Sequence, residues 1–347
     1  MKTSFAVAAP YGVGGLGRDL EEAVERAIAN DTLSRYYCLA PRIGDPNGVV
    51  VSHPAARFVL TRTPVRFSPG WRAGLSGYLF DRRAAATVVP GERHVGWSLH
   101  TLNTFRRLRA DYDCELVLWS PTSHIETVRR QHQRAFTAYP IERSWLNEFQ
   151  IRRATAEYAL ADTIVVAGEY VRESFLKAGF PAERLEVFSR TPAPRFQPTP
   201  RDSTPSFSVV YVGSLSVPKG VPLLIDAFGQ LRAPDARLTL VGGWGSRQMR
   251  RYTLNACQKD PRIVVAPGDP LGHMASADLC IHPSYDDGWA YSAAEALACG
   301  VPTIVTDNTG AKELITAPTT GRVIPTGDID ALVDTLRAYY RGGPRSS

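Results

Sequence analysis

The apolar positions of this chain fall into short runs of strand length and into longer stretches with helical spacing. In the first half the pattern predicts strands at residues 3–9, 35–40, 58–60, 93–97 and 115–119. In the second half it predicts strands at 208–212, 238–241, 263–266, 279–282 and 301–306. Helices are predicted at 19–29, 99–109, 127–136, 292–299 and 329–340, where apolar residues recur every three or four positions. This alternation of strands and helices favours an α/β fold, with parallel sheets covered on both faces.

The length of 347 residues is too great for one ordinary hydrophobic core, so two domains are expected. Residues 189–206 contain five prolines and few apolar positions, which is typical of a semi-rigid connection. We therefore predict a first domain at 1–190, a linker at 191–206 and a second domain at 207–347.

The composition, with 44% apolar and 21% charged residues, is that of a folded globular protein. The five cysteines lack C-x2-C spacing and are interpreted as core residues in a reducing compartment. Residues 1–9 are too few for a signal peptide, and no window has the roughly 18 apolar residues needed to span a bilayer. We expect a cytoplasmic protein.

The net charge of +6 is unevenly distributed along the chain. Residues 1–200 contain 26 basic and 20 acidic side chains, whereas 201–347 contain 14 of each. Such an excess favours an anionic partner, and the sequence has no nucleic-acid module. We expect an anionic or lipid-linked partner and peripheral association with the inner face of the membrane; a dispersed basic surface is the alternative. The arginines considered for the membrane are Arg82, Arg83, Arg106, Arg107, Arg109, Arg129 and Arg130.

The segment 67–80 leaves two interpretations open. Its apolar side chains, among them Trp71 and Tyr78, are interrupted by three glycines. It is either a packed core helix or an element that dips toward a membrane.

A glycine-rich loop at residues 10–17 follows the first predicted strand. Gly12, Gly14 and Gly17 match the dinucleotide fingerprint G-x-G-x-x-G, which also requires an acid about 20 residues further on. The second strand ends in Pro41 and Arg42 without such an acid, so an oxidoreductase is disfavoured. A loop that approaches a phosphate remains the prediction.

The stretch 284–315 has the strongest signs of a site. Asp286 and Asp287 lie in a turn before a helix that starts near Ser292, and the free amides of residues 289–292 are suited to a diphosphate. Glu295 lies one turn further in, where a carboxylate would repel phosphate but would accept hydrogen bonds from ribose hydroxyls. The alternative is that Glu295 is a solvated helix residue.

These residues carry a family resemblance. The run Asp-Gly-Trp-Ala-x4-Glu-Ala-Leu-Ala-Cys-Gly-Val-Pro-Thr-Ile at 287–304 resembles the E-G-F-G-x4-E-A segment of family 4 retaining glycosyltransferases with the GT-B fold. Residues 154–175, 309–315 and 326–328 continue the resemblance, with Asp287 in place of the usual Glu and Gly168 in place of a usual Ser. The family's fold is α/β, with two Rossmann-like domains facing each other across a cleft. It implies transfer of a sugar, with retention, from a nucleotide-sugar donor to a glycan, lipid-linked or small-molecule acceptor.

The resemblance also assigns roles to residues. Residues 213–228 are similar to the family's G-R-L-x4-K-G-x3-L-x-A-F, whose Arg and Lys hold the donor diphosphate; Lys219 matches, and Ser214 replaces the Arg. Arg247 is either the second cation or a surface residue. The implied catalytic residues are His124, Asp287 and Lys219. The implied donor-binding residues are Gly14, Gly15, Ser214, Lys219, Arg247, Gly288, Trp289, Ala290, Tyr291, Ser292 and Glu295.

His124 is also singled out by its position, because it follows a predicted strand, and ligands of open α/β sheets gather at the carboxyl ends of strands. A purely structural histidine is the alternative. In this position the resemblance implies a residue that lines the acceptor and donor-sugar pocket.

The chemistry implied by the resemblance needs no cofactor. The departing diphosphate can itself take the acceptor proton, so the protein must supply cations and amides to the phosphates. No metal is expected, because the only Asp-x-Asp pair considered, Asp111 and Asp113, precedes a strand at the wrong end. Two alternatives remain: a sugar-nucleotide epimerase of the same fold, and a catalytically silent glycan-binding relative, which Ser214 and Asp287 make conceivable.

Overall fold

The computed structural model describes residues 1–188, 190–198 and 206–342. The chain forms two compact units. The first consists of Met1–Thr127, Ser144–Ala167 and Val171–Phe188, and the second of Val128–Arg143, Gly168–Tyr170 and Ser189–Ser347. Two short segments before residue 188 are thus grouped with the second unit. The domain limits given above stay a prediction, and part of the expected linker, residues 199–205, lies outside the described residues.

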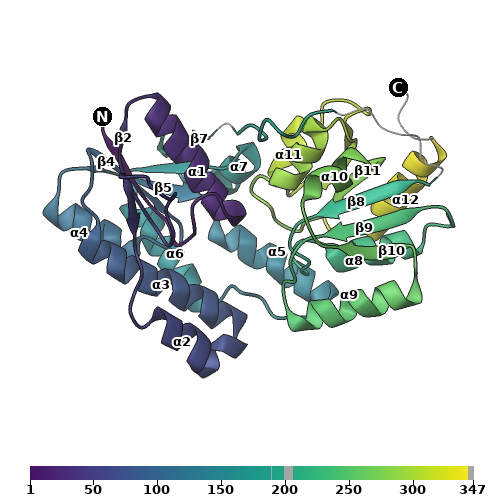
Figure 1. Cartoon of the computed structure of the whole chain (residues 1–347), viewed down its shortest axis with the longest axis horizontal. Coiled ribbons are helices and arrows are strands. Elements are labelled where there is room, and N and C mark those ends of the chain that lie inside the picture. Colours follow the sequence, from purple (N-terminus) through teal and green to yellow (C-terminus); the bar gives the residue numbers. More distant parts are fainter. Residues whose placement is uncertain (189, 199–205, 343–347) are drawn as a thin grey trace. The chain divides into compact units, whose positions relative to one another are not determined.

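The first unit contains a seven-stranded parallel sheet (Figure 1). Its strands, in spatial order, are β3 (Gly48–Val50), β2 (Leu33–Cys38), β1 (Thr3–Ala6), β4 (Arg93–Trp97), β5 (Glu115–Ser120), β6 (Thr163–Val166) and β7 (Leu185–Val187). From β1 the chain adds strands toward one edge of the sheet, as far as β3, and from β4 it adds them toward the other edge. The position between β1 and β4 is therefore the topological switch point, at which doubly wound folds bind ligands.

The helices of this unit are α1 (Gly14–Ala29), α2 (Ala56–Arg62), η1 (Pro64–Phe67), α3 (Pro69–Thr87), α4 (Leu102–Asp111), α6 (Glu148–Leu160), α7 (Glu169–Lys177, from Val171 on) and η2 (Ala182–Arg184). Helix α5 (Ile125–Ala138) begins in this unit, but from Val128 on it belongs to the second unit, where Ala135 joins the core. Helix α1 buries the face predicted from its spacing, which includes Leu20 and Val24, against strand residues such as Phe5 and Trp97. The alternating pattern therefore predicted this layer correctly.

Two predicted elements of the first unit need correction. Residues 58–60 were expected to form a strand but belong to α2, which buries no residue and leaves Phe58 64% exposed. Three apolar residues are too few to distinguish helix from strand.

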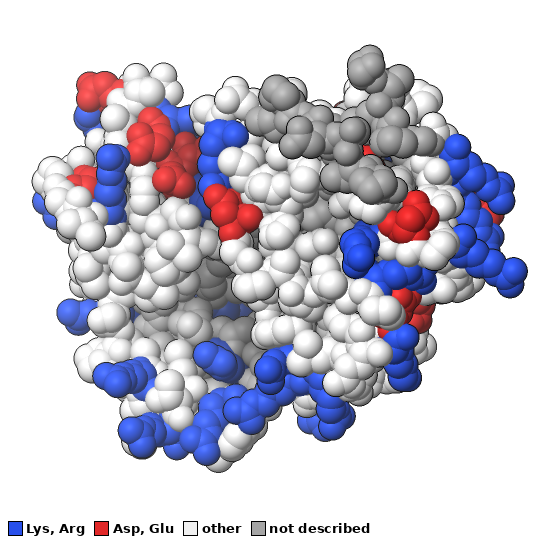
Figure 2. Space-filling model, turned by 45° about the vertical axis from the view of Figure 1, so that its right-hand side comes forward, with Lys and Arg blue, Asp and Glu red and all other residues white. Residues whose placement is uncertain are grey.

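Helix α1 begins at Gly14 rather than at residue 19, so the end of the glycine-rich stretch forms its first turn. A Cβ on Gly17 would lie 2.1 Å from the Pro10 carbonyl oxygen, so this turn needs glycine where it passes the loop. Basic side chains occupy the lower left of the face in Figure 2, where α2 lies.

The second unit contains a six-stranded parallel sheet with the same kind of strand order. The strands in spatial order are β10 (Ile263–Ala266), β9 (Arg237–Val241), β8 (Ser208–Val212), β11 (Leu279–His282), β12 (Thr303–Thr306) and β13 (Gly321–Ile324). Its helices are α8 (Val221–Gly229), α9 (Arg247–Lys259), α10 (Pro270–Ala275), α11 (Tyr291–Ala298), η3 (Gly310–Leu314) and α12 (Ile329–Arg341). The order reverses between β8 and β11, so the switch point of this sheet lies between these two strands.

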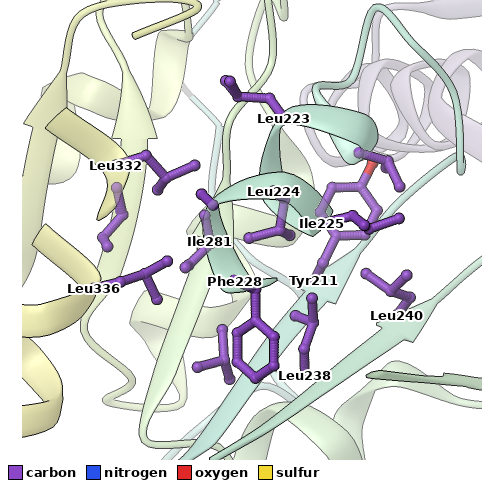
Figure 3. Close-up of a cluster of buried hydrophobic side chains, with 14 of the residues drawn as sticks. Tyr211, Leu223, Leu224, Ile225, Phe228, Leu238, Leu240, Ile281, Leu332 and Leu336 are labelled. Atoms are coloured by element: carbon purple, nitrogen blue, oxygen red, sulfur yellow. The ribbon is translucent and has the colours of Figure 1, made fainter. Parts of the chain in front are cut away.

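The core of the second unit lies between helices α8 and α12 and the sheet (Figure 3). Leu224 and Phe228 of α8 and Leu336 of α12 are fully buried against Leu238 and Ile281 of the strands. Complete burial of each such side chain contributes about 1.5–3 kcal/mol. The expected fold class, α/β with two Rossmann-like domains, is confirmed.

The five cysteines are all free thiols; Cys38, Cys280 and Cys299 are buried, and Cys114 and Cys257 are half-buried. Every helix in the described part of the chain is too short or too polar to cross a bilayer.

Candidate functional site

The loops that follow β8 and β11 meet at the switch point of the second sheet. The Tyr285 amide and the Ser284 hydroxyl both donate to the Pro218 carbonyl oxygen, at 2.8 and 3.2 Å. Gly220 has a φ of 71°, and a Cβ there would lie 1.9 Å from the Pro283 carbonyl oxygen, so only glycine permits this approach. The backbone thereby brings Lys219 of the first loop to the acidic turn of the second.

Asp287 is the centre of the polar contacts at this point. Its Oδ2 accepts hydrogen bonds from Lys219 Nζ at 2.6 Å and from His282 Nε2 at 2.8 Å, and its Oδ1 accepts one from the Ala290 amide at 3.0 Å. Burial alone would raise the pKa of Asp287, but the charge of Lys219 and the bond to His282 outweigh it and hold this pKa well below its usual range. Asp287 is therefore a carboxylate, and it fixes Lys219 at the end of the β8 loop.

Lys219 keeps binding capacity in this arrangement. An ammonium group has three N–H donors, and the bond to Asp287 uses one of them. The side chain of Lys219 is 29% exposed, so the remaining donors are accessible to a ligand.

His282, the last residue of β11, was missed by the sequence analysis. Its ring stacks on Tyr211, with an interplanar angle of 9°, and its Nδ1 lies 3.4 Å from the Ser292 hydroxyl. Because an ionised carboxylate only accepts, Nε2 donates to Asp287, and in a neutral ring Nδ1 accepts from Ser292. Like His124, His282 stands at the carboxyl end of a strand, so the same positional signal marks it in the sequence.

The start of helix α11 presents backbone donors. Among the described residues, the N–H groups of Gly288, Trp289 and Ser292 have no hydrogen-bond acceptor. Ala290, the N-cap, is held in the left-handed region with φ 62°, a conformation that costs a non-glycine residue about 1–3 kcal/mol. The hydrogen bond from its amide to Asp287 maintains this conformation, which suits an anion-binding turn.

Glu295 lies in the second turn of α11 and is only 3% exposed. The alternative that it is a solvated helix residue is therefore wrong. The predicted contact with a ribose stays a prediction.

The acidic turn is supported by residues of the family-like segment near residue 168. The Tyr170 hydroxyl donates to Asp286 at 2.6 Å, and the Tyr170 amide donates to Glu313 at 3.1 Å. Burial raises the pKa of Glu313. A Cβ on Gly168 would lie 3.2 Å from a Glu313 oxygen. Gly168, which stands where the resembling family usually has a serine, therefore makes room for the Glu313 carboxylate.

Ser214 lies on the loop after β8, and Arg247 directly follows the loop after β9; the two loops are joined at the same edge of the sheet. The Leu215 amide donates to Gly243 at 2.8 Å, and the Gly245 amide donates to Leu215 at 2.9 Å. Ser214 is exposed, and so is Arg247, the first residue of α9, which forms no ion pair with any described residue. Both side chains are thus accessible at the carboxyl ends of β8 and β9.

Gly14, Gly15 and His124 belong to the first unit. A Cβ on Gly14 or Gly15 would meet no atom within 4 Å, so the start of α1 borders open space. The His124 ring packs against Tyr158 and Phe175, with ring centroids 5.1 and 5.2 Å away. Lys219, Ser214, Arg247 and the α11 residues thus lie in the second unit, whereas the predicted roles of Gly14, Gly15 and His124 in the first unit stay predictions.

No cluster of three or more His, Cys, Asp or Glu side chains that could hold a metal ion occurs within residues 1–188, 190–198 and 206–342.

Comparison with known proteins gives consistent results. Residues 196–346 match the family described as "Glycosyl transferases group 1". The chain is 25% identical over 316 residues to a GDP-mannose-dependent alpha-(1-6)-phosphatidylinositol monomannoside mannosyltransferase of Mycolicibacterium smegmatis, covering 78% of this chain and 79% of that protein.

Two solved structures share the fold of the whole chain. WaaG, a glycosyltransferase involved in lipopolysaccharide biosynthesis, superposes with a TM-score of 0.69 at 17% identity, covering 98% of this chain and 90% of WaaG. Anabaena HepE in complex with UDP gives a TM-score of 0.67 at 16% identity, with the same two coverages.

Proposed function

From the premise that this chain is a glycosyltransferase of the GT-B fold, we propose that it transfers a sugar with retention from a nucleoside diphosphate sugar to a lipid-linked or glycan acceptor. The observation that carries this proposal is the pairing of a fixed cation, Lys219, with the free amides of Gly288, Trp289 and Ser292 at one switch point.

The donor diphosphate binds where these groups converge. Lys219 supplies a positive charge and the α11 amides supply N–H donors, so charge that develops on the leaving diphosphate is stabilised by groups already in place. Arg247 adds a second cation from the neighbouring loop, which compensates for Ser214. With protein cations and amides on the phosphates, the reaction proceeds without a metal or other cofactor.

Retention follows from the same arrangement if the acceptor approaches on the face from which the diphosphate departs. The leaving phosphate oxygen then takes the acceptor proton, and the protein needs no strong general base. Asp287 is fully occupied as the partner of Lys219 and His282, which suits a positioning role.

The choice of substrates draws on the relatives. The mycobacterial relative is named for GDP-mannose and a phosphatidylinositol mannoside, and the HepE structure contains UDP. GDP-mannose is therefore the first donor to test and UDP-glucose the second.

The test is incubation of the protein with a panel of nucleotide sugars, followed by measurement of free nucleotide. Slow hydrolysis of one donor, with release of sugar of unchanged anomeric configuration by NMR, is expected. Lys219→Ala should abolish it, whereas Lys259→Ala, which removes an exposed lysine from α9 of the same unit, should not. Isomerised donor would instead indicate an epimerase, and a donor left neither hydrolysed nor isomerised would indicate a catalytically silent relative.

A further inference from the structure

Helix α2, the 3-10 turn η1 and the first turn of α3 form an exposed projection of the first unit. These three elements pack on one another. Neither α2 nor η1 buries a single residue, although both contain large apolar side chains. Phe58 is 64% exposed, Phe67 70% and Trp71 49%. Three large aromatic side chains in water on adjoining elements mark an interaction surface, since isolated exposed apolar residues are normal but grouped ones are not.

The charge of this projection has one sign. Residues 46–80 contain four arginines and no aspartate or glutamate. Arg57, Arg62, Arg66 and Arg72 are all exposed and form no ion pair within the described chain. The next acid, Asp81, is fully buried and pairs with Arg153. Consistently, the lower left of the face in Figure 2 carries basic side chains and no acidic ones.

Arginines and aromatic rings are also adjacent in detail. The Arg66 guanidinium lies 4.5 Å from the centroid of the exposed Phe67 ring. The Trp71 ring is anchored by Phe149, with centroids 5.9 Å apart, while half of its surface faces solvent. Such pairs match the boundary of a bilayer, where arginines meet lipid phosphates and aromatic rings sit at the level of the headgroups.

We propose that Arg57, Phe58, Arg62, Arg66, Phe67, Trp71 and Arg72, the α2–α3 surface, dock the first unit on an anionic lipid bilayer. This inference rests on the proposed function in one respect, namely that a lipid-linked acceptor would lie in a membrane. The residues that support it are separate from the donor site. The occupant follows from charge complementarity: four unpaired arginines without one acid require an anionic surface, and three protruding aromatic rings require one with an apolar interior.

The test uses the full chain and vesicles of phosphatidylcholine, with or without phosphatidylglycerol, in the absence of donor and acceptor. Cosedimentation with the anionic vesicles is expected, and it should weaken at high salt because charges on the surface are screened. Replacing the four arginines of the α2–α3 surface by Gln should lower the partition constant by about several hundredfold, or about fivefold for each charge. The charge-matched control replaces four exposed arginines elsewhere, Arg35, Arg232, Arg237 and Arg251, by Gln and should retain most binding.

Insertion is tested separately from charge. Lipids brominated on the acyl chain should quench tryptophan fluorescence in the wild type, and Trp71→Phe should lose most of this quenching while still binding. Phe58→Ser with Phe67→Ser should weaken binding without changing the melting temperature, because both rings are exposed in the folded state.

Several outcomes would overturn the proposal. Equal binding to neutral and anionic vesicles, no binding at all, or equal losses in the arginine variant and its control would each do so. A dimer in sedimentation velocity that Phe58→Ser abolishes, with unchanged vesicle binding, would make a second copy the occupant. Hydrolysis of a donor by a chain that ignores vesicles would refute the docking surface alone and leave the proposed function intact.

Discussion

Asp287 combines three hydrogen bonds in one carboxylate, and its low pKa makes a prediction about stability against pH. The pKa of Asp287 is lowered in the folded chain, so its ionised form adds stability above the ordinary carboxyl pKa of about 3.9, and this stability is lost as pH falls. Asp287→Asn should therefore cost about 1–3 kcal/mol at neutral pH, the range for hydrogen bonds to a charged group. Urea denaturation should show a constant difference from the wild type between about pH 8 and 5 and a shrinking one below about pH 4. A difference that stayed constant into acid would mean that the ion pair contributes nothing.

Glu295 makes the second prediction at this scale. Glu295 is buried in α11, and the family resemblance places its carboxylate against a donor hydroxyl, so Glu295→Gln should weaken nucleotide binding by about 1–3 kcal/mol. Titration calorimetry with the preferred nucleoside diphosphate measures this directly. A matching loss with the corresponding deoxyribose nucleotide in the wild type would support the ribose as the partner, whereas unchanged affinity in the variant would remove the assignment.

Site residues that belong to a sequence motif could be predicted, whereas a site residue outside any motif could not. Lys219 and Asp287 were singled out from their motifs, and the structure shows them in contact. His282 had no motif, and its role depends on the Asp287 and Ser292 side chains that folding brings to the end of β11. Contacts between residues distant in sequence are set by the strand order, which spacing along one segment does not reveal.

At the scale of elements, the buried charges between α3, α4 and α6 hold the first unit together. Arg153 of α6 pairs with Asp81 of α3 and with Glu157, and all three side chains are buried. The two carboxylates accept hydrogen bonds from backbone amides at the start of α4, among them that of Thr104. The acidic side chains thereby cap a helix N-terminus, where negative charge is favoured.

This network predicts a large effect of one substitution. Arg153→Met should destabilise the protein by about 3–5 kcal/mol, because it leaves two buried carboxylates without their cation. The matched control is Arg109→Met, which breaks an exposed pair with Asp162 and should cost at most about 1 kcal/mol. Chemical denaturation of both variants measures the contrast, and similar losses would show that the buried network carries no special weight.

Elements were predicted well where apolar runs were long or flanked by turn residues. Strands β10 and β11 occur at the predicted residues, because β-branched and apolar residues fill both faces of a parallel strand. Helix α2 was predicted as a strand, since Phe58 is exposed, Val59 and Leu60 are only half-buried, and the three together carry no periodic signal of burial. The short edge strands β3 and β7 were not anticipated; each contributes three residues, too few to form a pattern.

At the scale of the molecule, the two sheets repeat one strand order, yet they differ in chemistry. The second unit contains the Lys219 and α11 groups suited to a diphosphate, and residues 201–347 carry balanced charge. The basic excess of residues 1–200 does not belong to the first unit alone, because Arg129, Arg130, Arg134, Arg143, Arg190 and Arg195 lie in the second unit. The first unit contains the glycines of α1, His124 and the α2–α3 surface. This division predicts that a change at His124, away from the glycines of α1, affects the acceptor and leaves the nucleotide affinity unchanged.

His124 provides the test of that division. Replacement by Phe keeps the aromatic packing on Tyr158 and Phe175 and removes the ring nitrogens, one of which accepts the Glu126 amide at 3.4 Å. If His124 lines the acceptor pocket, His124→Phe should reduce sugar transfer by about a hundredfold, the lower end of the range for loss of a side chain that assists proton transfer. Nucleotide affinity should stay as in the wild type, because the diphosphate contacts lie in the second unit. Melting temperature controls for misfolding, and transfer at the wild-type rate would make His124 a packing residue, with the acceptor bound by other side chains of the first unit.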